Sequence, residues 1–337
     1  MNSHECGPGL PPPRGPLSAA VAARLRGAGP LPGPAEAGEA DPYGDDLQLA
    51  LYLCYELHYR GFAGVAPECE WDPDLLRVRA ALERRFLSAL RADAPGHDSL
   101  DDALAALLTE PAEGSGVTHF LGTEGELWQL REYAAQRSLY HLKEADPHAW
   151  VLPRLWGRAK AGMAAVEFDE FGGGRADRVH AHLFAALMTD LGLDCSYGRY
   201  LDAARTEMLA VVNLMSLFGL HRGLRGALVG HFADVEITSS PGSRRLAEAM
   251  RRTGAGCAAE FFYDEHVVAD AVHEQVVRHE VIGGLLAEEP ELAADVAFGI
   301  DATEYLEDRL ARRLLADWRA GRSSLRTPLA PQTSHTS

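Results

Sequence analysis

Three residues in the C-terminal third of the chain have the spacing of metal ligands. His266, Asp270 and His273 stand in FFYDEHVVADAVHEQVVRHE as His-x3-Asp-x2-His. The segment has no Gly or Pro and repeats its apolar residues at helical spacing, which predicts a helix. At about 100° per residue, the three side chains point within about 60° of one another. Two imidazoles and a carboxylate on one face suit an Fe, Mn or Zn ion, although a chain with 14 His can also place them on a solvated surface.

A second group of candidate ligands lies upstream. Glu144 ends a predicted helix in HLKEADPHAW, and Glu170 ends the next one in VEFDEFGGGRADRVHAHLF. His180 follows the triple-glycine break on a third helix. With the C-terminal triplet, four helices would present six carboxylate and imidazole ligands to one bundle core: Glu144, Glu170, His180, His266, Asp270 and His273. This set suits a di-iron or di-manganese site, and the absence of thiolates argues against copper or structural zinc.

The pattern differs from that of ferritin-like di-iron proteins, which carry Glu-x-x-His on two helices. This chain instead has Asp177-x-x-His180 and Asp270-x-x-His273 on different helices. Asp177 lies one turn before His180, where it could orient the imidazole or simply face solvent. Glu167, one turn before Glu170, is a fallback ligand.

In this arrangement the sequence resembles the haem-oxygenase-like di-iron oxidases and oxygenases, also called iron-containing redox enzymes. The order and spacing of the six ligands match that family. The flanking text EFDEFGGGR…RVHAHLF and the segment LFGLHRGLRGALVGHF are also similar to it. The resemblance covers residues 125–320 and leaves 1–115 unexplained.

The resemblance implies an all-α, seven-helix haem-oxygenase-like bundle that binds two Fe(II) ions and no haem. It assigns His266, Asp270 and His273 to one iron and makes Glu170 a carboxylate shared by both. Glu170 and Asp270 are the expected catalytic ligands. O2 would be the co-substrate and a small organic molecule the substrate. The reaction would be N-oxygenation, desaturation or oxidative C–C cleavage, typically in specialised metabolism.

The resemblance also implies possible partners of the protein. Electrons are expected from an external reductase or from the substrate, because no G-x-G-x-x-G fingerprint is present. Bundles of this family often form homodimers. In the apolar helix TEMLAVVNLMSLFGLHRGLRG we expect substrate contacts from Asn213, Arg222 or Arg225, the arginines binding a carboxylate.

Three alternatives remain open at this point. One is a mononuclear metal hydrolase that uses only the C-terminal triplet. Another is a metal-free binding module on the same helical fold. The third is a thiaminase-like enzyme, which would need a cysteine nucleophile, and none of the five Cys has a base nearby in sequence.

Composition excludes some classes of function. The net charge of -17 argues against nucleic acid or an anionic membrane as partner, because both favour basic surfaces. The scattered cysteines form no C-x-x-C motif, so a reducing cytoplasm is the simplest setting. No signal peptide is visible, and the longest apolar run, 208–220, is too short and polar to span a bilayer.

The apolar pattern also predicts the organisation of the chain. Residues 1–43 are rich in Pro and Gly and predict disorder, as does the polar segment 323–337. Residues 44–115 predict an N-terminal helical extension, and 116–322 the di-iron domain. The expected helices cover 45–62, 73–93, 99–109, 124–145, 150–171, 176–191, 198–218, 221–235, 242–253, 257–287 and 290–320.

Overall fold

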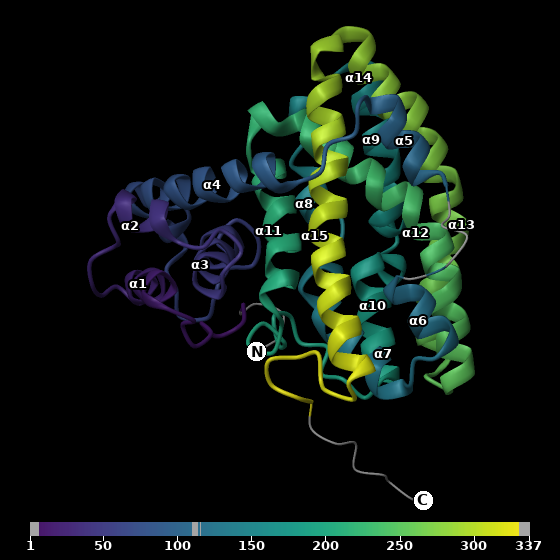
Figure 1. Ribbon diagram of the computed structural model, residues 1–337, viewed down its shortest axis with the longest axis horizontal. Coiled ribbons are helices and arrows are strands. Elements are labelled where there is room, and N and C mark those ends of the chain that lie inside the picture. Colours follow the sequence, from purple (N-terminus) through teal and green to yellow (C-terminus); the bar gives the residue numbers. More distant parts are fainter. Residues whose placement is uncertain (1–6, 110–113, 115, 330–337) are drawn as a thin grey trace, which may run out of the picture.

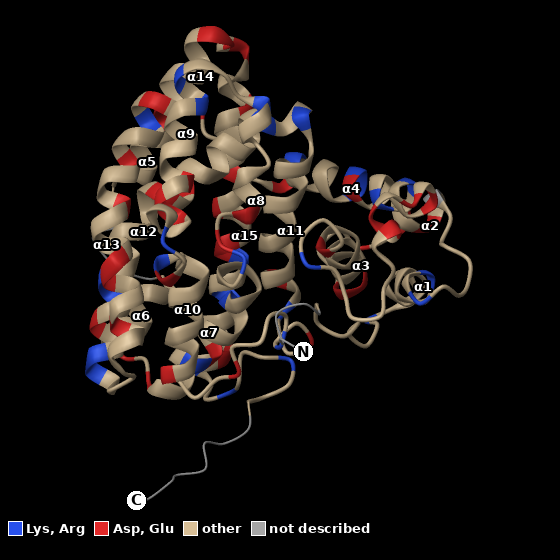
Figure 2. Cartoon of the chain, turned by 180° about the vertical axis from the view of Figure 1, so that it is seen from behind, with Lys and Arg blue, Asp and Glu red and all other residues tan. Residues whose placement is uncertain are grey.

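The computed structural model describes residues 7–109, 114 and 116–329. Within these residues the regular structure is helical and no strand is present (Figure 1), which confirms the predicted all-α class. None of the described helices is both long enough and apolar enough to cross a membrane. Acidic and basic residues are interspersed along the helices (Figure 2).

Long helices form the main bundle. Its principal members are α7 (Leu127–His141), α9 (Gly157–Glu170), α10 (His180–Asp190), α11 (Thr206–Leu220), α12 (Arg225–Thr253), α13 (Cys257–Val276) and α15 (Ala293–Arg319). Helix α12 packs against both α13 and α15, and α10 packs against α13. The bundle also contains α5 (Leu100–Leu107), α6 (Val117–Thr123), α8 (Asp146–Ala149) and α14 (Gly283–Glu288).

Two glycines allow α12 and α15 to approach closely. A Cβ atom on Gly230 would lie 1.9 Å from the carbonyl oxygen of Val296, and one on Gly299 would lie 2.1 Å from that of Ala227. Real Cβ atoms do not come so near, so any larger residue at either position would push the helices apart. The two glycines therefore let α12 and α15 pack closely. Both helices carry buried acidic side chains near this contact, Asp234 on α12 and Asp301 on α15.

Short turns of 3-10 helix connect these elements. They are η1 (Pro67–Trp71), η2 (Leu152–Arg154), η3 (Gly172–Gly174), η4 (Ala176–Arg178), η5 (Arg222–Leu224) and η7 (Pro290–Leu292). The single helix expected at 257–287 is interrupted by η6 (Val277–Ile282), a π-helical segment between α13 and α14. Conversely, α12 runs through Pro241 where two helices were expected. Packing of α12 against α13 and α15 offsets the cost of the missing hydrogen bond.

The N-terminal region forms a second group of helices beside α11 (Figure 1). It consists of α1 (Pro16–Leu25), α2 (Pro34–Glu39), α3 (Asp45–Glu56) and α4 (Pro73–Asp93). The expected disorder of 1–43 is therefore wrong for the segments that form α1 and α2. Leu17, Val21 and Leu25 recur every four residues and bury one face of α1, which packs against α3. Residues 1–6 lie outside the described part of the chain.

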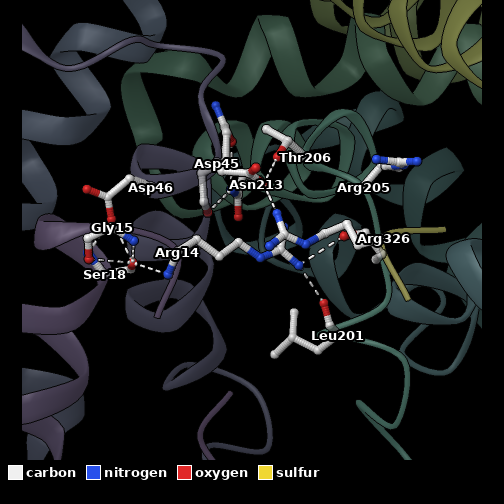
Figure 3. Close-up of polar contacts among 12 residues, drawn as sticks. Arg14, Gly15, Ser18, Asp45, Asp46, Leu201, Arg205, Thr206, Asn213 and Arg326 are labelled. Atoms are coloured by element: carbon white, nitrogen blue, oxygen red, sulfur yellow. Dashed lines mark hydrogen bonds and ion pairs between the residues drawn. The ribbon is translucent and has the colours of Figure 1, made fainter. Parts of the chain in front are cut away.

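Arg14 joins this region to the bundle (Figure 3). Its guanidinium donates to the carbonyl oxygens of Leu201 and Ala204 at 2.8 and 2.9 Å and pairs with Asp45 at 3.2 Å. Arg326 pairs with the same Asp45 carboxylate at 2.6 Å. One carboxylate thus links segments from the beginning, middle and end of the chain.

The C-terminal segment is also ordered by contacts, at least up to residue 329. Ser324 and Leu325 are buried, and the Ser324 amide and hydroxyl both donate to Glu132, at 2.7 and 2.8 Å. The expected disorder of 323–337 is wrong for this part, because the buried carboxylate of Glu132 needs those donors. Residues 330–337 lie outside the described residues.

Candidate metal centre

Four helices converge on a first cluster of buried side chains. Glu144 follows the end of α7, Glu170 ends α9, His180 begins α10 and His266 lies in the middle of α13. All four are buried, and one nitrogen or carboxylate oxygen from each lies within 4.8 Å of the others. The residue after Glu144, Ala145, has φ 75°, so the chain turns sharply once that carboxylate has been placed.

A second cluster lies beside the first and shares one residue with it. It consists of Glu170, Glu236, Asp270 and His273, all buried, with donor atoms again within 4.8 Å of one another. The Nδ1 atom of His273 lies 3.1 Å from Glu236 and 3.6 Å from Asp270. Glu170 reaches both clusters: its Oε2 lies 2.7 Å from His180, and its Oε1 lies 3.7 Å from His273. Its position between the two groups is that of a bridging carboxylate.

Several donor atoms of these clusters have no hydrogen-bond partner among the described residues. They are one oxygen each of Glu144 and Asp270 and the Nε2 of His266. Leaving a buried polar atom unpaired costs roughly 1–3 kcal/mol, so native proteins rarely do so without a reason. Two metal ions bound by these atoms would remove the deficit, and the donor set of carboxylates and imidazoles suits iron or manganese.

Two of the histidines are held in orientation by their second ring nitrogen. His266 donates from Nδ1 to the carbonyl oxygen of Phe262 at 2.7 Å, which directs its Nε2 toward the first cluster. His273 has its Nε2 3.4 Å from Asp169 and directs its Nδ1 toward the second. Such contacts fix the tautomer of metal-binding histidines.

The comparison with known families points the same way. The family model described as iron-containing redox enzyme matches residues 131–308, more than half of the chain. This chain belongs to that family. The match contains all seven residues of the two clusters. No curated protein matches the chain.

Membership in the iron-containing redox enzyme family supports an oxidoreductase and agrees with the all-α haem-oxygenase-like bundle. It also gives the shared position of Glu170 a chemical context, since the buried clusters could hold iron.

The electrostatics of the centre show a strong coupling between imidazoles and carboxylates. Burial alone would lower the pKa of His266, but Glu144 raises it to about 10. Burial would likewise lower the pKa of His273, but Asp270 and Glu236 raise it to about 11. Burial raises the pKa of Glu236 to about 8. The charges of Asp270 and Glu170 add to this effect, and the hydrogen bond with His273 opposes it. In the metal-free protein these groups therefore hold protons that a metal ion must displace.

Sequence reasoning missed Glu236. It lies within a long helix and has no ligand motif at fixed spacing around it, so nothing local marks it as a ligand. The available signal was weaker: two acidic residues, Asp234 and Glu236, interrupt the run ALVGHFADVEI, where buried apolar side chains are expected. Placing α12 against α13 is a tertiary effect that no local pattern encodes.

The other residues singled out near the ligands have different surroundings. Asp177 is exposed and pairs with Arg175 at 2.9 Å, so it does not orient His180. Glu167 is buried, yet neither carboxylate oxygen has a hydrogen-bond partner among the described residues. Burial, followed by the charges of Glu170 and Glu236, raises the pKa of Glu167 to about 9. Glu167 is therefore a neutral acid beside the second cluster at neutral pH.

A cavity of about 410 Å³ opens from the metal centre into the bundle. The centre contributes Glu144, Glu170, Glu236, His266 and Asp270 to its lining. Aromatic side chains cover the nearby walls, among them Tyr140, Tyr263 and Phe262. The remaining walls come from α6, α7, α12 and α15. Its volume suits a small organic molecule.

The structure does not support the three expected substrate contacts. Asn213 lies on the opposite side of α11 and donates to the backbone and side-chain oxygens of Gln48, each at 2.8 Å. Arg225 pairs with Glu289, and Arg222 is exposed. None of the three lines the cavity. The expectation was wrong because each polar group serves the packing between helices or faces solvent.

Proposed function

We propose that this protein is a non-haem di-iron oxidase or oxygenase that uses O2 to oxidise a small organic substrate. The observation that carries the proposal is the position of Glu170, shared by two buried clusters of four ligands. The unpaired donor atoms in those clusters and the adjoining cavity support it. Specialised metabolism is the setting that the family suggests.

In this proposal Glu144, His180 and His266 would hold one iron, Glu236, Asp270 and His273 would hold the other, and Glu170, which belongs to both clusters, would be shared between them. When bound, the two irons would supply the redox chemistry with O2. The protein's own groups do the rest. Phe262 and Asp169 fix the orientations of two histidines, and the walls of the cavity would orient the substrate.

The position of the C-terminal triplet bears on the mononuclear alternative. His266 belongs to the first cluster, whereas Asp270 and His273 belong to the second. A hydrolase that placed one ion among all three residues would need a different arrangement of α13. The metal-free alternative leaves the unpaired donors without a partner. Both observations favour two metal ions over one or none.

The test is an anaerobic Fe(II) titration of the metal-free protein, followed by a pulse of O2 under optical monitoring. We expect two irons per chain, one for each cluster, and an O2-dependent change in the visible spectrum. Asp270→Ala removes a ligand from one cluster and should lose one iron, whereas Glu170→Ala should weaken both. Asp177→Asn, in an exposed ion pair, is the matched control and should behave as the unmodified protein.

The outcomes separate the alternatives. A single iron that is lost equally in both variants, with no reaction with O2, would favour the mononuclear hydrolase. No binding at all would leave the fold standing and overturn the metal chemistry.

A further inference from the structure

A second pocket reaches the metal centre apart from the cavity. This side pocket, of about 390 Å³, lies between α13 and the segment that joins α9 to α10. None of its lining residues also lines the cavity. His180 of the first cluster forms part of its wall, whereas five other residues of the two clusters line the cavity. The metal centre is therefore approached by two separate hollows.

Glycines keep side chains out of part of the side pocket. Gly172 and Gly173 line it with φ of 75° and 61°, in the left-handed region that favours glycine. A Cβ atom on Gly172 would lie 2.7 Å from the backbone of Arg178, closer than real Cβ atoms come. Because these two positions carry no side chain, the turn before His180 leaves space in front of that ligand.

Asp169 connects the side pocket to the second cluster. Its side chain lines the pocket and is 57% exposed, yet its Oδ2 atom lies 3.4 Å from Nε2 of His273, which is 2% exposed. The other ring nitrogen of His273 faces the second cluster, 3.1 Å from Glu236. One solvent-exposed carboxylate thus contacts a buried residue of the second cluster, while His180 joins the same pocket to the first.

The charges of the side pocket leave Asp169 as its unpaired carboxylate. Arg178 forms an ion pair with Glu265, and Arg175 pairs with Asp177 at 2.9 Å. No Arg or Lys in the described part of the chain forms an ion pair with Asp169, whose ionic contact is with His273. A hollow with an excess of negative charge concentrates cations and raises the rate at which they bind.

From these contacts we propose that Fe(II) enters and leaves the metal centre through the side pocket, and that Asp169 is the first side chain to bind the arriving ion. The inference rests on the proposed function, because it needs clusters that hold iron. A hydrated divalent ion favours carboxylate oxygen, which Asp169 offers at the surface. The ion would then exchange Asp169 for ligands of the two clusters, and the larger cavity would stay available to the organic substrate.

The experiment measures how fast iron is bound rather than how much. The metal-free protein is mixed rapidly with Fe(II) under anaerobic conditions, and unbound ion is trapped with ferrozine at set times. Asp169→Asn keeps an oxygen that can accept from His273 but loses the charge. We expect it to bind the same number of irons about tenfold more slowly at low salt, with the difference shrinking at 1 M salt, where exposed charges are screened.

A bulky side chain tests the pocket without changing its charge. Val268 lines the side pocket and is 72% exposed, whereas Val272, one turn further along α13, is 61% exposed and does not line it. Val268→Trp should slow both the uptake of Fe(II) and its release to ferrozine by at least about tenfold, with an unchanged Kd. Val272→Trp is the matched control and should load and release at the original rates. Unchanged rates in Val268→Trp or in Asp169→Asn overturn the inference.

The cavity provides the opposite test. Asp308 is its exposed carboxylate, with 73% of the side chain accessible. If Asp308→Asn slows loading more than Asp169→Asn does, iron enters through the cavity and the inference is wrong.

The two proposals fail in distinguishable ways. If Fe(II) does not bind at all, the di-iron function and the entry pocket both fall. If two irons bind and react with O2 while Val268→Trp loads at the original rate, the function stands and the entry pocket is wrong.

Discussion

The metal centre and the Glu56–Lys143 ion pair are both buried and charged. The charged atoms of the pair have partners within the protein, whereas some donor atoms of the metal centre do not. Lys143 Nζ lies 3.0 Å from Glu56 Oε2, with side chains 1% and 0% exposed. The other Glu56 oxygen accepts a hydrogen bond from Tyr197 at 2.7 Å. In the metal centre, one atom each of Glu144, Asp270 and His266 has no such partner. Lys143 and Glu144 are adjacent in sequence, but Lys143 is fully paired, whereas Glu144 has one oxygen 2.7 Å from His141 Nδ1 and its other oxygen without a partner.

This difference distinguishes a structural polar group from one that awaits a bound partner. The Glu56–Lys143 pair joins α3 of the N-terminal region to the end of α7, and it stacks its ammonium over the Tyr59 ring at 4.1 Å. Its atoms gain nothing from an added ion. The carboxylates and imidazoles of the metal centre attract one another, but in each of its two clusters some of the donor atoms that lie within 4.8 Å of one another have no partner. Burial alone therefore does not identify a ligand, whereas several buried donor atoms that lie within 4.8 Å of one another and include unpaired ones indicate a site.

Breaking the satisfied pair should have the largest effect on stability. Lys143→Met leaves Glu56 charged and buried without its partner, and we expect a loss of about 3–5 kcal/mol in the free energy of unfolding. Urea denaturation of the metal-free protein measures it. The double variant Lys143→Met with Glu56→Gln removes both charges and should recover much of the loss. A single variant as stable as the original would show that the pair is not a structural link.

Glu167 tests the other side of this comparison, because it is a buried carboxylate without a hydrogen-bond partner among the described residues. Its effect on stability should depend on pH. Its pKa is about 4.5 in the unfolded chain and about 9 in the folded protein, where burial disfavours the charge. Between these values the folded state binds the extra proton, so the stability of the metal-free protein should fall as pH rises, by at most about 1.4 kcal/mol per pH unit. Glu167→Gln cannot ionise and should show a shallower decline.

Thermal melts of both proteins from pH 5 to 9 measure this effect. The melting temperature of the Gln variant should exceed that of the original increasingly toward pH 9. Parallel curves would mean that Glu167 is not held as a neutral acid, for example because it has a partner that the folded protein supplies.

Most helices could be predicted from the sequence, because their apolar residues repeat on one helix face. The 73–93 helix was predicted with the bounds that α4 has, because Asp72 caps it and Pro73 begins it. The bounds failed where tertiary packing overrides local signals. Pro241 lies inside α12, and α1 forms in a segment whose Pro and Gly content suggested disorder.

The six ligands predicted for the metal centre stay predictions until a metal titration tests them, but the structure brings all six together. They were visible because His-x3-Asp-x2-His marks one helix face and the family spacing supplies the rest. Glu236 was not visible, because its role depends on how α12 packs against α13. Asn213 and Arg225 failed for the converse reason: their polar side chains belong to contacts between helices.

Arg225 gives the smallest expected effect and closes the comparison, since it is another satisfied charge. Its Nε lies 3.2 Å from Glu289, and the two side chains are 13% and 16% exposed. Arg225→Ala should cost about 1–3 kcal/mol of unfolding free energy, the penalty for a half-buried carboxylate that loses a charged donor. The exposed Arg222→Ala is the matched control and should change stability by no more than about 0.5 kcal/mol. Neither variant should alter iron content, because neither side chain belongs to a cluster or lines the cavity. Lower iron content in Arg225→Ala at full stability would show that this paired charge also supports the metal centre, and would break the distinction between paired and unpaired charges.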